Sequence, residues 1–283
     1  MKIYNVILNH IILPISEYIF AIPLSKEIDS LEKTTQLSSI EIEEHQKNKL
    51  ENFLKFATEN SEYYKKLEIS LVKNNPIENL KKFPILTKSI LKENTNIILT
   101  EPKINLLKNG SSGSTGEQTI VYWSKKEQTI NRATQLLWWK WGNYTIGDRL
   151  IQTGITPNRI GVKKYKDFFF RTKYIQAFSH NSEEIASFLN SLNPKKEYIL
   201  VGYASSLFVF SKIAKGNNIN IKIKSAISWG DKLFAHYKIA IQEVFGCKTY
   251  ETYGSAEGLM IGAQKDLDYL YIMSTNVFVE IVD

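Results

Sequence analysis

A short run of small and hydroxylated residues, Ser111-Ser112-Gly113-Ser114-Thr115-Gly116, has the composition of a phosphate-binding loop. Small residues let successive backbone N–H groups turn toward one point, which makes a nest for an anion. Four hydroxyl side chains in the run would add donors for phosphate oxygens. No lysine follows Gly116, so the run is not a Walker A loop. A flexible Gly/Ser linker has a similar composition, and the phosphate interpretation therefore needs support from elsewhere in the chain.

A second polar segment, Thr252-Tyr253-Gly254-Ser255-Ala256-Glu257-Gly258, follows a run that we expect to be a strand, residues 248–253. Ligands of open α/β sheets bind beyond the carboxyl ends of the strands. A carboxylate such as that of Glu257 is the kind of oxygen ligand that Mg²⁺ prefers. Alone, the segment is equally typical of a strand followed by a glycine turn and a polar helix cap.

The elements that would position these segments fall into two regions. Residues 1–100 are predicted to be helical and to pack on the core, and residues 101–283 to form an α/β core with a largely parallel sheet flanked by helices. Thr87 is the expected N-cap of a helix that precedes the Ser/Gly run. We predict strands at 120–123, 150–154, 198–201, 221–228 and 248–253, and helices at 125–142, 183–192, 205–215 and 233–245.

In this order and near this separation, the two segments resemble the phosphate loop and the Tyr-Gly-x-x-Glu segment of adenylate-forming enzymes. Over roughly residues 80–283 the chain is most similar to the phenylacetate-CoA ligase-like branch, which includes proteins of capsular polysaccharide biosynthesis. Phe83-Pro84-Ile85-Leu86-Thr87-Lys88 resembles an entry phrase of that branch. Ser228-Trp229-Gly230-Asp231-Lys232-Leu233 resembles its Ser-x-Gly-Glu-x-Leu segment, with Asp231 in place of the usual Glu. Gly147-Asp148-Arg149 is also similar to a phrase of the branch, but it equally fits a plain turn and receives no role.

The resemblance implies a ligase that activates a carboxylic acid with ATP as an acyl-adenylate and then transfers the acyl group to CoA or another thiol or amine acceptor, a carrier protein included. It implies Mg²⁺ held by Glu257, an adenine face at Tyr253 and a phosphate donor at Ser255. The implied catalytic residues are Ser114, Thr115 and Glu257. The implied nucleotide-binding residues are Ser111, Ser112, Gly113, Ser114, Thr115, Gly116, Gly230, Asp231, Tyr253, Gly254, Ser255 and Glu257.

The sequence departs from the branch in two ways. The Cys/His cluster common near the second segment is missing, because Cys247 stands alone and Tyr271 falls where a His is common, so we expect no zinc. The ribose-binding Asp, the hinge and the small C-terminal domain with its catalytic Lys would lie beyond Asp283. Val277-Phe278-Val279-Glu280-Ile281-Val282-Asp283 is predicted to be an alternating strand without a partner. We therefore expect the polypeptide to continue, or a second chain to supply the C-terminal domain, and little adenylation by these residues alone.

Two other classes of protein remain open. A non-catalytic relative could bind a nucleotide or a partner without turnover. A nucleic-acid binder would use the net charge of +7 and stacking surfaces at Trp138, Trp139 and Trp141. Tryptophans at this spacing on an apolar helix are more often core residues, and the lysines are scattered beside Glu and Asn, so we expect no nucleic acid. His236 lies close enough in sequence to Asp231 to approach the pocket, although a surface histidine is the simpler interpretation.

Composition fits a cytoplasmic globular protein. The chain is 43% hydrophobic and 23% charged, and its one cysteine excludes a disulfide framework between its own cysteines. The apolar stretch 3–24 is interrupted by polar residues and Pro14, so we predict buried N-terminal segments and no stable membrane insertion, with contact at a membrane surface the lesser option.

Overall fold

The computed structural model describes residues 3–110, 120–154, 162–178, 181–255 and 257–281, and divides them into two compact units. Unit 1 comprises Met1–Ser25, Thr134–Gly254 and Ile261–Ile272, and unit 2 comprises Lys26–Ala133, Ser255–Met260 and Met273–Asp283. The units interleave in sequence and do not follow the expected boundary at residues 100/101. That boundary, and the packing of residues 1–100 on the core, stay predictions.

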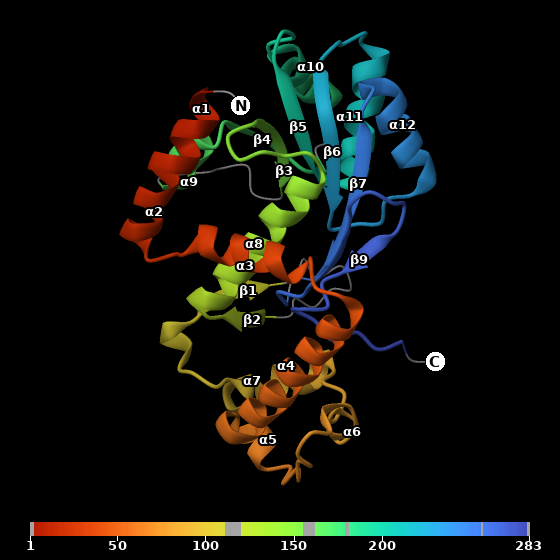
Figure 1. Ribbon diagram of the computed structural model, residues 1–283. Helices are drawn as coiled ribbons and strands as arrows, with labels where there is room; N and C mark the ends of the chain where they lie inside the picture. Colours follow the sequence, from red (N-terminus) through yellow and green to blue (C-terminus); the bar gives the residue numbers. More distant parts are fainter. Residues whose placement is uncertain (1–2, 111–119, 155–161, 179–180, 256, 282–283) are drawn as a thin grey trace. The chain divides into compact units, whose positions relative to one another are not determined.

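Unit 1 is built on a twisted sheet that contains seven strands within the described residues, in the order β4-β3-β5-β6-β7-β8-β9 (Figure 1). The first five strands in this order pair in parallel, and β8 and β9 form an antiparallel pair. The strands are β3 (Arg149–Gly154), β4 (Thr172–Gln176), β5 (Glu197–Tyr203), β6 (Lys222–Trp229), β7 (Lys248–Gly254), β8 (Met260–Gln264) and β9 (Leu270–Ile272). The predicted α/β class with a mostly parallel sheet is confirmed.

Helices cover both faces of this sheet because its central strands are apolar on both sides, as in β5, where Tyr198–Gly202 is continuously buried. The helices of unit 1 are α1 (Ile3–Ile7), the π-helical η1 (Leu8–Ile12), α2 (Leu13–Phe20), α9 (Val162–Phe169), α10 (Ser182–Asn190), α11 (Ala204–Gly216), α12 (Ala235–Phe245) and the second half of α8 (Lys125–Trp141). One core cluster joins α10, α11 and α12 to the sheet, including Leu207, Phe210 and Ile241. On α8, Trp138 and Trp139 are buried, so neither can serve as an exposed stacking surface for nucleic acid.

Unit 2 is mainly helical. Its elements are α3 (Leu24–Thr34), α4 (Ser39–Asn60), α5 (Glu62–Lys65), α6 (Pro76–Leu80), α7 (Lys88–Ile98), the 3-10 helix η2 (Lys103–Asn105), β1 (Leu107–Gly110) and β2 (Ile120–Trp123). Helix α4 begins at a capping box, in which Ser38 and Glu41 satisfy each other's backbone N–H groups. The Oγ1 of Thr87 accepts from the backbone N–H of Ile90 at 3.3 Å, which confirms the predicted cap of α7.

Two terminal predictions were wrong. The strand expected at 277–283 is absent over the described residues 277–281. The Gln46 side chain of α4 instead donates to the Val277 carbonyl at 3.3 Å. The N-terminal stretch forms helix from Ile3 to Phe20, and only 17% of it is buried, although we expected buried segments. Its length and composition would suffice to cross a membrane, a property that soluble core helices and signal sequences share.

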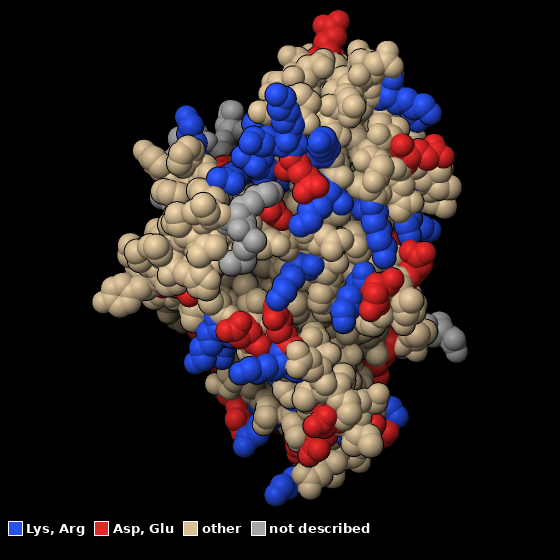
Figure 2. All heavy atoms as spheres, turned by 45° about the horizontal axis from the view of Figure 1, so that its top comes forward, with Lys and Arg blue, Asp and Glu red and all other residues tan. Residues whose placement is uncertain are grey.

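Figure 2 shows one face of the molecule, on which Lys and Arg atoms gather in the upper part with a few Asp and Glu atoms among them, while both signs mix over the lower part. These charged atoms lie at the surface, which agrees on this face with the interpretation of the +7 charge as mostly solvated side chains.

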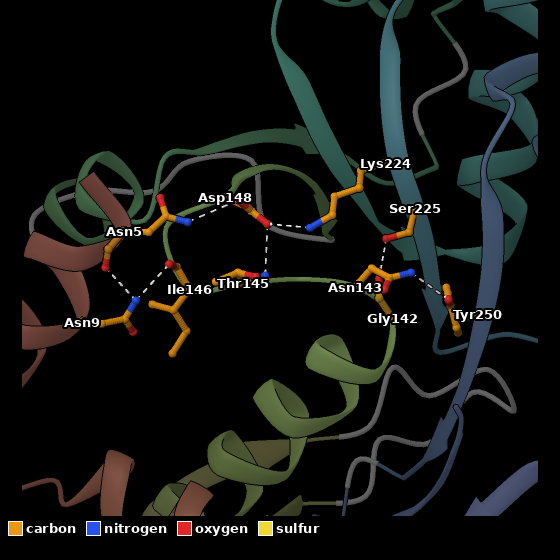
Figure 3. A network of polar contacts seen from close by, with 10 residues as sticks. All are labelled: Asn5, Asn9, Gly142, Asn143, Thr145, Ile146, Asp148, Lys224, Ser225 and Tyr250. Atoms are coloured by element: carbon orange, nitrogen blue, oxygen red, sulfur yellow. Dashed lines mark hydrogen bonds and ion pairs between the residues drawn. The ribbon is translucent and has the colours of Figure 1, made fainter. Parts of the chain in front are cut away.

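A network of polar contacts at Asp148 joins the N-terminal helix to the sheet (Figure 3). The Asp148 carboxylate accepts from Asn5 Nδ2 at 3.4 Å, from the Thr145 backbone N–H at 3.1 Å and from Lys224 Nζ at 3.2 Å. Gly147 precedes it with φ +97°, and a Cβ there would lie 3.0 Å from Asn5 Oδ1. The Gly-Asp-Arg phrase is thus a turn that joins α1 to β6.

We predict that Asp148→Ala lowers the free energy of unfolding by about 2–4 kcal/mol, because it leaves Lys224 and a buried amide without their acceptor. Chemical denaturation of the whole chain measures this change. The control is Asp268→Ala, which breaks the Lys238–Asp268 pair of 2.7 Å, in which Asp268 is exposed, and is expected to cost less than about 1 kcal/mol. Equal losses in the two variants would contradict the anchoring role.

Candidate functional site

The carboxyl ends of four parallel strands meet at one edge of the sheet in unit 1. Strands β3, β5, β6 and β7 end there at Gly154, Tyr203, Trp229 and Gly254. The polar turn after β6 and the second polar segment after β7 therefore start from adjacent strands, in the register Ser228↔Glu251. This is the edge at which α/β sheets bind ligands.

The Asp231 carboxylate caps helix α11. Its Oδ1 accepts from the Ala204 backbone N–H at 2.5 Å, and its Oδ2 accepts from that of Ser205 at 3.0 Å. Tyr203, the N-cap residue, supplies no side-chain cap, so the turn after β6 provides the anionic partner for the helix N-terminus. The carboxylate predicted to bind nucleotide thus has a structural partner in this chain, and its nucleotide role stays a prediction.

Gly230 allows the close approach that this cap requires. Its φ is +79°, and a Cβ there would lie 2.5 Å from Cε1 of Tyr203. The Tyr203 ring also lies 4.7 Å from the Phe178 ring, between centroids. Burial, together with the nearby Tyr174 and Asp231, raises the pKa of Tyr203, so its hydroxyl stays protonated at neutral pH.

Two hydroxyl groups complete this edge. Thr153 Oγ1 accepts from the Tyr203 backbone N–H at 3.1 Å, which locks the end of β5 to β3. Ser205 Oγ, on the first turn of α11, is buried without a hydrogen-bond partner in the described part of the chain. A buried hydroxyl without a partner is a group that a bound ligand or water can satisfy.

The end of β7 presents one exposed aromatic ring. Thr252 Oγ1 donates to the Ser228 carbonyl at 2.8 Å, and Gln264 Oε1 accepts from the Glu251 backbone N–H at 3.0 Å, so the two residues before Tyr253 are held in place. The Tyr253 side chain projects beyond these contacts and is 57% exposed. A ring held on a fixed backbone and open to solvent can stack on a planar base.

The rest of the second segment belongs to unit 2, because the boundary falls between Gly254 and Ser255. There, the Ser255 N–H donates to the Leu259 carbonyl at 2.8 Å, and Trp123 Nε1 donates to the Glu257 carbonyl at 3.1 Å. The Ser255 hydroxyl is buried and has no partner among the described residues. Glu257 is exposed and forms no ion pair with any described residue, so its carboxylate is available for a ligand.

The Ser/Gly run lies outside the described residues, so the placement of Ser111, Ser112, Gly113, Ser114, Thr115 and Gly116 stays untested. Strands β1 and β2 flank it on either side and pair in an antiparallel manner, with Gly110 opposite Ile120. Gly110 and Ile120, which stand on either side of the Ser/Gly run, are therefore neighbours in this strand pair. Sequence reasoning anticipated β2 but not β1.

Several groups at the edge were not identified from the sequence. Thr153, Phe178 and Tyr203 lie far apart along the chain, and none belongs to a recognisable motif. The available signal was the position of Thr153 near the end of the predicted strand 150–154 and of Tyr203 two residues after the predicted strand 198–201. His236 is exposed and packs on neighbouring aromatic rings, with the Tyr237 ring at 4.5 Å, which fits a surface histidine.

No group of three or more His, Cys, Asp and Glu side chains that could hold a metal ion is found among the described residues. Mg²⁺ is commonly held by one or two carboxylates together with substrate phosphates, so a single exposed carboxylate at Glu257 fits such an ion. The Cys247 thiol is buried, and burial raises its pKa to about 12, which makes it a poor metal ligand or nucleophile at neutral pH.

Comparisons with known proteins bear on the fold of the chain. No family model matches the chain. Protein CapK of Staphylococcus aureus is 24% identical over 253 residues, which cover 83% of this chain and 55% of CapK. A crystal structure of 2-hydroxyisobutyryl-CoA ligase in the postadenylation state with R3-HIB-AMP aligns with a TM-score of 0.66 and 15% identity, covering 84% of this chain and 54% of the ligase.

A second structure of the same ligase, with 2-HIB-AMP and CoA in the thioesterification state, aligns with a TM-score of 0.65 and 17% identity, over 84% of this chain and 55% of that one. The fold of this chain is that of the adenylate-forming acyl-CoA ligases, which confirms the resemblance predicted from the sequence. The similarity to CapK fits the capsular branch. The chain spans about half the length of these relatives.

We predict that Asp231→Ala destabilises the first turn of α11 by about 1–2 kcal/mol, because two backbone N–H groups lose their acceptor. Amide hydrogen exchange measured by mass spectrometry should show faster exchange in the peptide that begins at Ala204. Asp231→Asn keeps one acceptor oxygen, so its exchange rate in this peptide should lie between those of Asp231→Ala and the wild type. Thr87→Ala, which removes the cap of α7, should leave exchange at α11 unchanged; unaltered exchange in Asp231→Ala would refute the cap.

Proposed function

We propose that this chain forms the nucleotide-binding part of an AMP-forming ligase that activates a carboxylic acid. The observation that carries the proposal is the arrangement at the carboxyl edge of the sheet, where the Gly230-Asp231 turn and the exposed Tyr253 ring follow adjacent parallel strands. The fold shared with a ligase whose structures contain acyl-AMP supports the same conclusion.

In the proposed reaction, an oxygen of the substrate carboxylate attacks the α-phosphorus of ATP. The new O–P bond replaces the bond to pyrophosphate, which leaves with its electron pair, and the product is an acyl-adenylate. A thiol or amine acceptor, such as CoA or a carrier-protein thiol, then attacks the acyl carbon, loses its proton and releases AMP. The protein contributes mainly positioning and stabilisation of developing charge.

The predicted site residues of this chain would each have a separate role in binding ATP. Tyr253 would stack on the adenine, the Ser255 hydroxyl would donate to a phosphate oxygen, and the Ser/Gly run from Ser111 to Gly116 would bind the β- and γ-phosphates. Ser114 and Thr115 would act nearest the reacting phosphate. Mg²⁺, when bound, would offset phosphate charge, and the exposed Glu257 carboxylate is the group that would hold it.

The whole protein would act on a small carboxylic acid in the cytoplasm. The resemblance of its motifs to the capsular branch supports a role in the synthesis of a capsular polysaccharide, and the similarity to CapK is consistent with that branch. Its partners would be ATP and CoA or a carrier protein, with a C-terminal domain supplied by further sequence or by a second chain. A nucleic-acid role has less support, because two of the three tryptophans invoked for stacking are buried. A non-catalytic nucleotide-binding relative is the second candidate, favoured by the structural use of the Asp231 carboxylate.

We predict that the chain binds ATP more tightly with Mg²⁺ than without, and that Glu257→Gln removes most of this difference, about ten-fold in the dissociation constant, because a neutral amide does not match the charge of the carboxylate. Isothermal titration calorimetry with and without Mg²⁺ measures both values. Glu243→Gln, at an exposed glutamate on α12, is the matched control and should behave as the wild type. Equal ATP affinity of the wild type with and without Mg²⁺ would contradict the role of Glu257.

A second prediction concerns the base. Tyr253→Ala should weaken ATP binding by about ten-fold, because stacking of a base on an aromatic ring contributes about 1–3 kcal/mol. Tyr253→Phe keeps the ring and should bind ATP nearly as the wild type does. Tyr269→Ala, another exposed tyrosine of similar exposure, should have no effect. If Tyr253→Ala binds ATP unchanged, the adenine lies elsewhere.

A further inference from the structure

The N-terminal helix of unit 1 exposes a continuous row of isoleucines. Ile3, Ile7, Ile11, Ile15 and Ile19 follow one another every four residues, and each is between 41 and 81% exposed. Tyr18 and Phe20 add exposed aromatic rings at the end of α2. The segment from Ile3 to Phe20 contains no Lys or Arg. An apolar surface of this kind is normally covered by a partner.

The opposite face of the same helix is fixed to unit 1, so the exposure of the isoleucine row is a property of the fold. Leu8 and Leu13 are buried, and Asn5 donates to the Asp148 carboxylate (Figure 3). Asn9 Nδ2 donates to the Ile146 carbonyl at 3.3 Å. Glu17, the one acidic residue of the segment, accepts from the N–H and the hydroxyl of Ser25, at 2.5 and 2.8 Å.

Helix α9 extends this surface with aromatic side chains. Tyr165, Phe168 and Phe169 are exposed, and the chain at the end of α9 lies beside α1 (Figure 1). Tyr4 joins the two elements, because its hydroxyl donates to the Phe169 carbonyl at 2.6 Å. We call the isoleucine row together with the exposed rings of α2 and α9 the apolar face.

One cationic side chain contacts the N-terminal helix, and two others lie a few residues away along the chain. The Arg171 guanidinium lies 3.4 Å from the centroid of the Tyr4 ring, and the exposed Lys164 on α9 and Lys173 on β4 are close in sequence to the exposed rings of α9. Exposed apolar and aromatic side chains edged by Lys and Arg are the combination that binds the headgroup region of an anionic membrane. A protein partner would have to supply both a complementary apolar surface and anionic charge. An anionic membrane supplies both, because its acyl chains are apolar and its headgroups carry negative charge.

We propose that the apolar face binds the surface of a membrane that contains anionic lipids, and that α1, η1 and α2 lie in the plane of the interface. The buried face of the helix stays attached to unit 1 through Asn5, Leu8, Asn9 and Leu13, so the helix lies on the bilayer and does not cross it. The isoleucines enter the boundary between headgroups and acyl chains, and Arg171, Lys164 and Lys173 meet the lipid phosphates. The proposed ligase chemistry would then take place at the membrane surface.

Vesicle co-sedimentation of the whole chain tests this proposal. With vesicles of phosphatidylcholine and phosphatidylglycerol in equal parts, we expect binding that weakens as salt is raised, and much weaker binding to phosphatidylcholine alone. Ile11→Asp and Ile15→Asp should each lower the partition coefficient by about ten-fold, because each removes a side chain that is buried on binding. Ile239→Asp, at an isoleucine on α12 with a similar exposure of 54%, should bind as the wild type.

Charge variants test the basic edge separately. Lys164→Glu and Lys173→Glu should each weaken binding to the anionic vesicles by about five-fold, while Lys215→Glu on α11 should not. Circular dichroism and ATP affinity, which should be unchanged in all these variants, exclude misfolding as the cause. Three results would overturn the proposal: wild-type binding by the Ile11 and Ile15 variants, retention on vesicles through alkaline carbonate extraction, which indicates a spanning helix, or a dimer that these variants dissociate without any vesicle binding by the wild type.

Discussion

Parallel pairing of β3, β5, β6 and β7 is the constraint on which the rest of unit 1 depends. Parallel strands cannot be joined by tight turns, so each needs a crossover, and the crossovers become the helices that bury both faces of the sheet. The same pairing brings the ends of strands from distant parts of the chain to one edge. The Asp231 carboxylate then joins two of these crossovers, because the turn after β6 caps the helix that follows β5. The position of the candidate site therefore follows from the parallel topology. The Asp231 cap on α11 then fixes the turn that lies at this edge.

The fold was largely predictable because its strands and helices carry strong local patterns. Apolar runs such as Tyr198–Gly202 identify central strands, and Thr87 identified a helix start by its side-chain chemistry alone. Edge elements were harder: β4, β8 and β9 are short, and α9 is an amphipathic helix that sequence reasoning did not anticipate. The C-terminal strand was predicted from alternation although the sequence offered no partner strand, and without one the described backbone is contacted by the Gln46 side chain of α4 instead.

The site was predictable only where its residues follow one another along the chain. Tyr253 and Glu257 belong to a recognisable motif, whereas Thr153, Phe178 and Tyr203 come together only through the sheet. The role of Asp231 shows a further limit. A motif identifies a carboxylate, but which donors it meets depends on the neighbouring helix. The N-terminal helix shows the same limit, since its sequence did not reveal that one face is buried and the other, with its isoleucines, is exposed.

We propose that the adenylate binds at the carboxyl edge of the sheet. A crystal structure of the chain with a non-hydrolysable acyl-adenylate analogue, such as an acyl-sulfamoyl adenosine, would locate it. We expect density for adenine against the Tyr253 ring and beside the Gly230-Asp231 backbone. Density for the adenosine at the opposite edge of the sheet, near Asp148 and Lys224, would contradict it.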